Sequence, residues 1–249
     1  HNTSHKITER KKMMEGERPS ECKFCWDIED LKNFNISDRF YKSGRHGALT
    51  RFDEIVKDPY SVKFRPSYVE VSFSNVCQFK CSYCSANFSS SWEEEIEKMG
   101  PYSTYSGHKT IKTYKDEESN PYIKAFWDWW PELSRSLHTL RITGGEPLLS
   151  PTTFRVLEKI LQEPLPHLNI ALNSNLGAPS VLVDKFIDYA ARLSAAQAVA
   201  SVSVYTSIDG FGAAAEYMRY GLKSDVFWGN MEKLLKADPL FESVEASLK

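Results

Sequence analysis

Residues 68–74 read Tyr68-Val-Glu-Val-Ser-Phe-Ser74, and two residues later the chain continues as Cys77-Gln-Phe-Lys-Cys-Ser-Tyr-Cys84. The first segment is typical of a short strand, and the second holds three of the five cysteines of the chain. A strand that runs into Cys-x-x-x-Cys-x-x-Cys delivers three thiolates within one tight loop. Thiolates are soft ligands that select zinc, copper(I) or iron–sulfur clusters. The sequence therefore predicts a metal site at the end of this strand.

Downstream of this strand, short apolar runs alternate with amphipathic stretches. Alternation of this kind predicts an α/β fold with a parallel sheet and right-handed crossovers. The further strands are expected at Thr139–Thr143, Leu168–Asn173, Ser201–Ser207 and Val244–Leu248, and the helices at Thr153–Leu161, Ser180–Arg192 and Asp225–Lys236.

The first connection, from Cys84 to Leu137, is longer than one strand–helix unit needs and must contain an additional element. Within it, Phe126, Trp127 and Trp130 recur at helical spacing. This pattern favours a helix that buries its aromatic face in the core or at a domain boundary. A stacking platform for a substrate is the alternative.

The composition is that of an ordinary globular chain: 249 residues, 41 % hydrophobic and 26 % charged, with a net charge of -2. No global charge imbalance indicates nucleic acid or a membrane surface, and no apolar run approaches the ~20 residues of a spanning helix. The odd number of cysteines, clustered as Cys22/Cys25 and Cys77/Cys81/Cys84, favours metal ligands over disulfides. We therefore expect a reducing, cytoplasmic location.

The chain divides on composition into a mixed, charged segment at residues 1–66 and a core at residues 67–249. It starts without methionine and stops at Lys249 in what the pattern predicts to be the middle of an element. We expect a longer protein, of which this is a fragment or the ordered part.

The cysteine loop is one ligand short of a structural zinc site, which is closed by four protein ligands. The nearest histidines in the sequence are His46 and His108. A cubane cluster held by three cysteines leaves one iron open, where a ligand can be activated. A non-catalytic zinc- or iron–sulfur-binding interaction module remains the alternative.

The sequence resembles radical S-adenosylmethionine (radical SAM) enzymes at four successive strand ends. The resemblance rests on Cys77-x3-Cys81-x2-Cys84 with Tyr83 before the third cysteine, on Arg141-Ile-Thr-Gly-Gly-Glu-Pro147, on Leu172-Asn-Ser-Asn175 and on Ser207-Ile-Asp-Gly210. It implies a TIM-like partial (βα)6 barrel, of which the C-terminal strands are missing or only begun here. In parallel barrels the chemistry lies at the carboxyl ends of the strands, where all four motifs fall.

The resemblance implies that Cys77, Cys81 and Cys84 bind a 4Fe-4S cluster and that S-adenosylmethionine occupies the open iron. Gly144 and Gly145 would let the backbone approach the cofactor, and Glu146 would hold its ammonium group. The other cofactor-binding positions that the resemblance implies are Tyr83, Asn173, Asn175, Ser207 and Asp209. Taken singly, the three later motifs are also compatible with a tight turn, a plain turn and a helix cap.

A second resemblance concerns Cys22-Lys-Phe-Cys25-Trp26 and its surroundings, which are similar to the twitch (SPASM-like) subgroup of radical SAM proteins. There, the upstream cysteines belong to an auxiliary iron–sulfur cluster. This chain offers only Cys22 and Cys25 for it, so further ligands would lie outside residues 1–249. Zinc binding and no metal are the alternatives.

The implied activity is reductive cleavage of S-adenosylmethionine to a 5′-deoxyadenosyl radical that abstracts hydrogen from a substrate. The expected partners are an electron donor such as flavodoxin or ferredoxin, and a peptide, protein or small-molecule substrate. No side chain is assigned as a catalytic acid or base, because the cofactors carry out the bond cleavage and the radical chemistry.

Overall fold

The structure, a computed structural model, describes residues 3–31, 36–44, 51–58, 60–61, 65–103 and 113–248. The chain forms two compact units, residues 1–67 and residues 68–249, which are described separately. The histidines considered as a fourth zinc ligand, His46 and His108, lie outside the described residues.

The larger unit is built on a five-stranded parallel sheet with the order β1-β3-β4-β5-β7. The strands are β1 (Tyr68–Ser72), β3 (Thr139–Thr143), β4 (Leu165–Asn173), β5 (Val199–Ile208) and β7 (Ser243–Leu248). All four strand pairs are parallel. The predicted α/β class is thereby confirmed. The strands follow one another in chain order, which is the order that a barrel segment requires.

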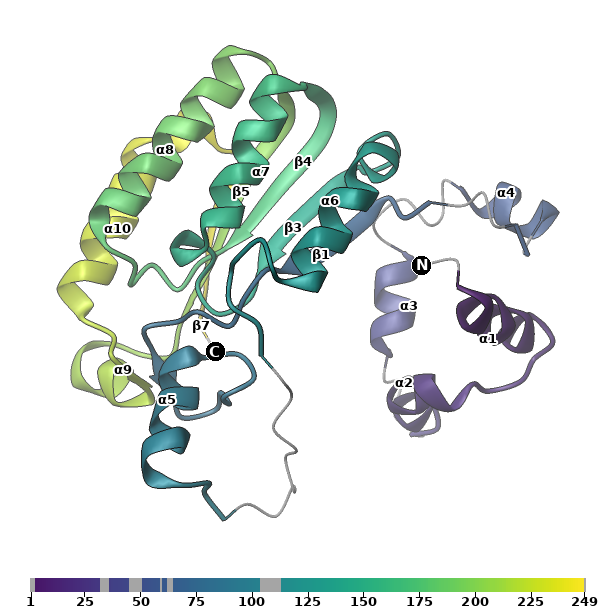
Figure 1. Ribbon diagram of the computed structural model, residues 1–249, viewed down its shortest axis with the longest axis horizontal. Coiled ribbons are helices and arrows are strands. Elements are labelled where there is room, and N and C mark those ends of the chain that lie inside the picture. The colour runs from purple at the N-terminus through teal and green to yellow at the C-terminus, as the bar shows by residue number, and fades with distance from the viewer. Residues whose placement is uncertain are drawn as a thin grey trace. The chain divides into compact units, whose positions relative to one another are not determined.

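The helices that connect these strands cover one face of the sheet (Figure 1). They are α6 (Pro121–Leu133), α7 (Pro151–Gln162), α8 (Ser180–Ala195) and α10 (Ser224–Lys236). Right-handed crossovers between strands in sequential order place every connecting helix on the same side. The short 3₁₀ helices η3 (Pro147–Leu149) and η4 (Asp238–Leu240) precede α7 and β7.

The two faces of the sheet differ in polarity because side chains alternate along each strand. Leu140, Ile142, Ile170, Leu172, Val202 and Val204 are almost fully buried and form the core with the helices. The opposite face carries Arg141, Asn173 and Tyr205, which are half-buried. The apolar face fixes the sheet against the helices, and the polar face is left for other contacts.

Helix α6 confirms the prediction made from its aromatic spacing. Phe126 and Trp130 are buried, and Trp127 packs partly buried against the same core. The ring centroids of Phe73 and Phe126 lie 5.2 Å apart in an edge-on arrangement. This is one of the geometries that aromatic pairs prefer. Asn120 caps the helix by accepting hydrogen bonds from the backbone of its first turn.

Two short strands, one within the cysteine loop and one that pairs with it, have no signal in the sequence pattern. The short strands β2 (Lys80–Cys81) and β6 (Arg219–Tyr220) form an antiparallel pair. Helices α5 (Ser90–Met99) and α9 (Gly212–Met218) lie close to it. Two-residue strands are too short to produce an alternating pattern, so tertiary contacts alone define them.

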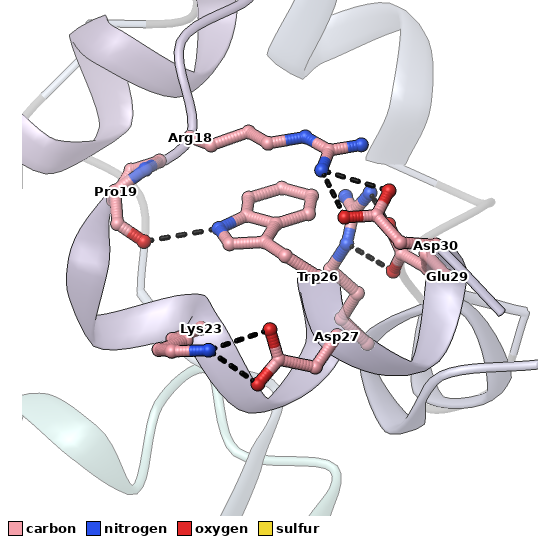
Figure 2. A network of polar contacts seen from close by, with 8 residues as sticks. Arg18, Pro19, Lys23, Trp26, Asp27, Glu29 and Asp30 are labelled. Atoms are coloured by element: carbon pink, nitrogen blue, oxygen red, sulfur yellow. Dashed lines mark hydrogen bonds and ion pairs between the residues drawn. The ribbon is translucent and has the colours of Figure 1, made fainter.

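The smaller unit contains α1 (Ser4–Met14), η1 (Ser20–Cys22), α2 (Lys23–Glu29), α3 (Asp38–Ser43) and α4 (Phe52–Lys57). Figure 2 shows its centre, where the Trp26 indole N–H donates to the Pro19 carbonyl at 3.0 Å. The Arg18 and Arg39 guanidinium groups lie over the Trp26 ring, 5.4 and 4.1 Å from its centroid. Each arginine is also bonded to a carboxylate, Arg18 to Asp30 and Arg39 to Glu29. Within the described ranges, no helix of either unit is long and apolar enough to cross a membrane.

Candidate functional site

The three cysteines of the loop open onto one cavity at the carboxyl ends of the strands. Its volume is about 320 Å³. The strand ends contribute residues from three of the predicted motifs. The lining consists of Cys77, Phe79, Cys81, Tyr83, Cys84, Phe88, Arg141, Gly144, Gly145, Asn173, Ser174, Asn175, Tyr205, Thr206, Ser207 and Arg219. Segments far apart in the sequence thus meet where the loops of a parallel sheet converge.

The cysteine loop is held in place by the start of helix α5. The hydroxyls of Ser89 and Ser91 donate to the carbonyls of Phe79 and Cys77 at 2.6 and 2.8 Å. The Trp92 indole N–H donates to the Cys81 carbonyl at 3.0 Å. A loop that turns its thiols toward a cavity leaves backbone carbonyls without regular partners, and these side chains satisfy three of them. This positioning role was not assigned from the sequence.

Asn175 connects the end of β4 to the first cysteine. Its side-chain N–H group donates to Cys77 Sγ at 3.6 Å, and its oxygen accepts from Gln78 Nε2 at 3.0 Å. The Phe79 backbone N–H also donates to Cys77 Sγ, at 3.5 Å. Hydrogen bonds to ligand sulfurs tune iron–sulfur potentials. Asn175 therefore contacts a predicted ligand as well as lining the cavity.

Burial raises the pKa of each thiol in the loop. The pKa of Cys77 rises to about 11, and those of Cys81 and Cys84 also rise, chiefly through burial. For Cys81 the charge of Arg219 acts in the opposite direction. Metal ligation requires thiolates, so a bound metal would have to displace these protons.

Gly144 and Gly145 allow two backbone segments of this chain to approach each other closely. A Cβ at Gly145 would lie 2.3 Å from the Val76 carbonyl oxygen, and one at Gly144 would lie 2.7 Å from Ser72 Oγ. Gly144 also has a φ of 122°, a conformation that side chains rarely adopt. These glycines bring the end of β3 against the backbone that leads into the cysteine loop, while still lining the cavity.

Glu146 is buried and connects the segments that follow β3 and β4 through hydrogen bonds. It is 1 % exposed, and its carboxylate accepts hydrogen bonds from the Leu148 N–H at 3.0 Å, the Asn175 N–H at 2.7 Å and Ser174 Oγ at 2.8 Å. Burial raises its pKa to about 7, and these hydrogen bonds oppose the shift. The side chain is committed to protein groups, and its contact with a cofactor ammonium group stays a prediction.

Three other predicted positions, Tyr83, Ser207 and Asp209, are joined by a residue that was not predicted, Arg219. Arg219 forms a buried ion pair with Asp209 and donates to Ser207 Oγ at 2.8 Å. Tyr83 donates to the same Asp209 carboxylate at 2.8 Å. The pKa of Tyr83 is raised, chiefly by burial and secondly by this hydrogen bond to Asp209.

Arg219 reaches this position because its backbone pairs with Cys81 in the β2–β6 ladder. The segment after β5 is therefore attached directly to the cysteine loop. The signal that could have indicated it is the arginine ten residues after Asp209, but spacing alone carries no geometry.

The donor set of the loop fits an iron–sulfur cluster in its chemistry. Within the part of the chain that the structure describes, the ionisable side chains that line the cavity are the three thiols, two tyrosines and two arginines, and the lining has no carboxylate or imidazole. Among the described residues, no three histidine, cysteine or acidic side chains converge closely enough to hold one metal ion. A cluster does not need such convergence, because each cysteine binds a different iron atom.

In the smaller unit, Cys22 and Cys25 lie at the end of η1 and on α2, half-buried and free. The Arg39 guanidinium beside them has a raised pKa, first through its hydrogen bond to Glu29 and also through the charges of Cys25 and Cys22. Their membership of an auxiliary cluster stays a prediction.

No protein-family model matches this chain. A GTP 3′,8-cyclase of Nautilia profundicola is 31 % identical over 108 residues, which is 43 % of this chain and 27 % of that protein.

Among solved structures, Streptococcus suis SuiB bound to S-adenosylmethionine is similar, with a TM-score of 0.46, 12 % identity, and coverage of 96 % of this chain and 44 % of that one. SuiB bound to the precursor peptide SuiA gives a TM-score of 0.45 at 11 % identity, covering 96 % of this chain and 45 % of that one. Native anSMEcpe with bound AdoMet gives 0.41 at 20 % identity over 73 % of this chain and 43 % of that one. The chain thus spans less than half the length of each protein it matches here.

Proposed function

We propose that this chain contains the core of a radical S-adenosylmethionine enzyme. Cys77, Cys81 and Cys84 would hold a 4Fe-4S cluster, and S-adenosylmethionine would take the open iron. The observation that carries the proposal is the cavity in which these three thiols meet the ends of β3, β4 and β5. The partial sequence likeness to a GTP 3′,8-cyclase supports the superfamily.

When bound and reduced, such a cluster would supply the electron that cleaves S-adenosylmethionine to methionine and a 5′-deoxyadenosyl radical, which abstracts hydrogen from a substrate. The residues of this chain would position the reactants. Ser89, Ser91 and Trp92 fix the loop carbonyls, and Asn175 fixes Cys77.

The remaining cavity groups suit the polar parts of S-adenosylmethionine. Asn173 and Ser207 offer an amide and a hydroxyl at strand ends, and neutral hydrogen-bonding groups of this kind can bind ribose hydroxyls and a carboxylate. Tyr83, half exposed and anchored through its hydroxyl to Asp209, presents its ring for packing against the adenine.

Several finer assignments belong to the same proposal. Cys22 and Cys25 would contribute to an auxiliary iron–sulfur cluster of a twitch-type region. A flavodoxin or ferredoxin would donate the electron, and the substrate would be a peptide, a protein or a small metabolite. The location would be the cytoplasm.

The test is anaerobic reconstitution with iron and sulfide, then reduction in the presence of S-adenosylmethionine. We expect brown protein that forms 5′-deoxyadenosine, and loss of that product in Cys81→Ala. The matched control, Cys22→Ala with Cys25→Ala, should lower the iron content and keep the cleavage. Full cleavage by Cys81→Ala, or one zinc per chain without iron–sulfur absorbance, would instead favour the non-catalytic metal-binding module.

A further inference from the structure

The antiparallel pair of β2 and β6 has one face toward the cavity and one face away from it. Cys81 is paired with Arg219, and both residues line the cavity. Lys80 is paired with Tyr220, and neither belongs to the described lining. Side chains alternate between the two faces of a strand. Contacts that fix the Lys80 side chain on the outer face therefore also fix the direction of Cys81 on the inner face.

On the outer face, Lys80 forms an ion pair with Glu95 of helix α5. The two side chains are only 23 and 24 % exposed, and the Tyr102 hydroxyl donates to the same Glu95 carboxylate. Partly buried pairs are screened by salt much less than exposed pairs. The ion pair thus joins the middle of the cysteine loop to the helix that follows the loop.

Two aromatic rings also contact the Lys80 ammonium group. Its Nζ lies 4.5 Å from the centroid of the Tyr220 ring and 5.9 Å from that of the Trp92 ring. A cation over an aromatic face is attracted by the ring in addition to its ion pair. Trp92 also donates its indole N–H to the Cys81 carbonyl at 3.0 Å. One tryptophan thus contacts both the charged side chain and the backbone of the cysteine next to it.

The charge of Lys80 is directed away from the cavity. Its ammonium group is bound to a carboxylate and two rings on the outer face, so its donors are engaged by protein groups. A comparable ion pair lies elsewhere in the same unit, where Lys233 of α10 contacts Asp184 of α8 at 2.6 Å. That pair joins two helices that contain no residue of the cysteine loop, and it therefore serves as a reference.

We propose, building on the proposed function, that Lys80 is a positioning residue, which holds Cys81 toward the cavity before iron arrives. A thiol that already points into the cavity needs less reorganisation when a cluster is inserted. Residues that orient the ligands of a metal site change metal affinity or activity by about 10–100-fold when they are replaced. Lys80 acts on the cluster site through the direction of its neighbour and through Trp92, without touching the cavity.

The experiment compares four variants with wild type. Lys80→Met and Glu95→Gln each remove the ion pair of the loop, and Lys80→Arg keeps a cation that can pair with Glu95 and stack on the rings. Lys233→Met is the matched control, because it removes the reference pair between α10 and α8. Urea unfolding of the unreconstituted proteins measures how much each change lowers the free energy of unfolding.

The first measurement uses unreconstituted protein and needs no cluster. Iodoacetamide labelling under reducing conditions is followed for each cysteine by mass spectrometry. Cys81 should react faster in Lys80→Met and Glu95→Gln than in wild type, because a loosened strand exposes its thiol. The rate should stay near that of wild type in Lys80→Arg and Lys233→Met. Cys22, which lies in the other unit, provides the internal reference.

The second measurement follows anaerobic reconstitution. The half-life of the iron–sulfur absorbance in the presence of the iron chelator bathophenanthroline disulfonate should fall roughly tenfold in Lys80→Met and Glu95→Gln. It should be close to the wild-type value in Lys80→Arg and in the control Lys233→Met.

Unchanged Cys81 labelling or unchanged iron loss in Lys80→Met and Glu95→Gln would overturn the proposal. So would an equal effect in Lys233→Met, because the cause would then be a general loss of stability. Failure of the proposed function shows separately, as the absence of an iron–sulfur spectrum in wild type. The labelling of unreconstituted protein still tests the role of Lys80 in that case.

Discussion

Asn175 Nδ2 lies 3.6 Å from Cys77 Sγ, so the end of β4 donates a hydrogen bond to the first cysteine of the loop. The same side chain accepts from Gln78 Nε2 and from the Gly177 N–H, at 3.0 and 2.8 Å. An amide held from both sides cannot turn away from the sulfur. Asn175 is therefore a fixed dipole next to one corner of the proposed cluster.

Replacing Asn175 by Ala should lower the reduction potential of the reconstituted cluster, because a hydrogen bond to sulfur stabilises the more negative state. One such bond is worth about 1 kcal/mol, or roughly 40 mV for one electron. Redox titration followed by electron paramagnetic resonance measures the shift. The control is Gln78→Ala, which removes a partner of Asn175 and keeps the bond to Cys77. Equal potentials in wild type and Asn175→Ala would contradict the role.

Glu146 should make stability depend on pH. Its folded pKa of about 7 exceeds the ordinary value of 4.5, so the folded state holds the proton more tightly than the unfolded state. Stability from this group is complete below pH 4.5 and declines as the pH rises to about 7. The decline is about 3 kcal/mol at most. Urea unfolding of wild type and Glu146→Gln between pH 5 and 8 should give curves that separate across this window. Parallel curves would contradict the assignment.

Gly145→Ala and Gly229→Ala form a matched pair. The first would place a Cβ 2.3 Å from the Val76 carbonyl oxygen and must displace the backbone before the cysteine loop. We expect it to lower iron incorporation and stability. Gly229 is in helix α10 with nothing within 4 Å of an added Cβ, so alanine there should stabilise by roughly 0.5–1 kcal/mol. Thermal unfolding and iron content distinguish the two, and normal loading of Gly145→Ala would refute the steric argument.

Removing one member of the Arg219–Asp209 pair should lower the free energy of unfolding much more than removing both. Arg219→Met leaves the Asp209 carboxylate buried without its cation, which costs about 3–5 kcal/mol. The double variant with Asp209→Leu should recover much of that loss, since neither charge remains. Urea unfolding of the unreconstituted proteins gives the three values. A double variant no more stable than Arg219→Met would indicate that the pair contributes through something other than charge.

The sequence predicted the sheet well because the strands carry strong local signals. The segment Thr139–Thr143 is β3 without change, and Ser201–Ser207 lies within β5. The apolar alternation of these strands decides which face is buried. The fifth strand, expected at Val244–Leu248, begins one residue earlier. The first strand ends at Ser72 instead of Ser74, because the chain leaves the sheet to pass beneath Gly144 and Gly145.

The candidate site was less predictable than the sheet. Motif spacing identified Cys77, Cys81 and Cys84, and the structure brings all three to one cavity. Spacing did not reveal that Asp209 is paired with Arg219 or that Glu146 is enclosed by backbone N–H groups. Both depend on contacts between separate strand ends, which leave no periodic signal in the chain.

Several hydrogen bonds of the cysteine loop join it to residues far along the chain, which bears on when the cluster can be inserted. Tyr83 hydrogen-bonds to Asp209, 126 positions later in the chain. Ser82 contacts Met218, 136 positions later, and Cys77 accepts from Asn175, 98 positions later. Contacts this distant in sequence slow folding, because long loops must close before they form. During synthesis the three thiols emerge together with Ser89, Ser91 and Trp92 but long before these distant partners. Iron should be inserted only after β4, β5 and α9 have docked, and until then the loop depends on a reducing environment to keep its cysteines available.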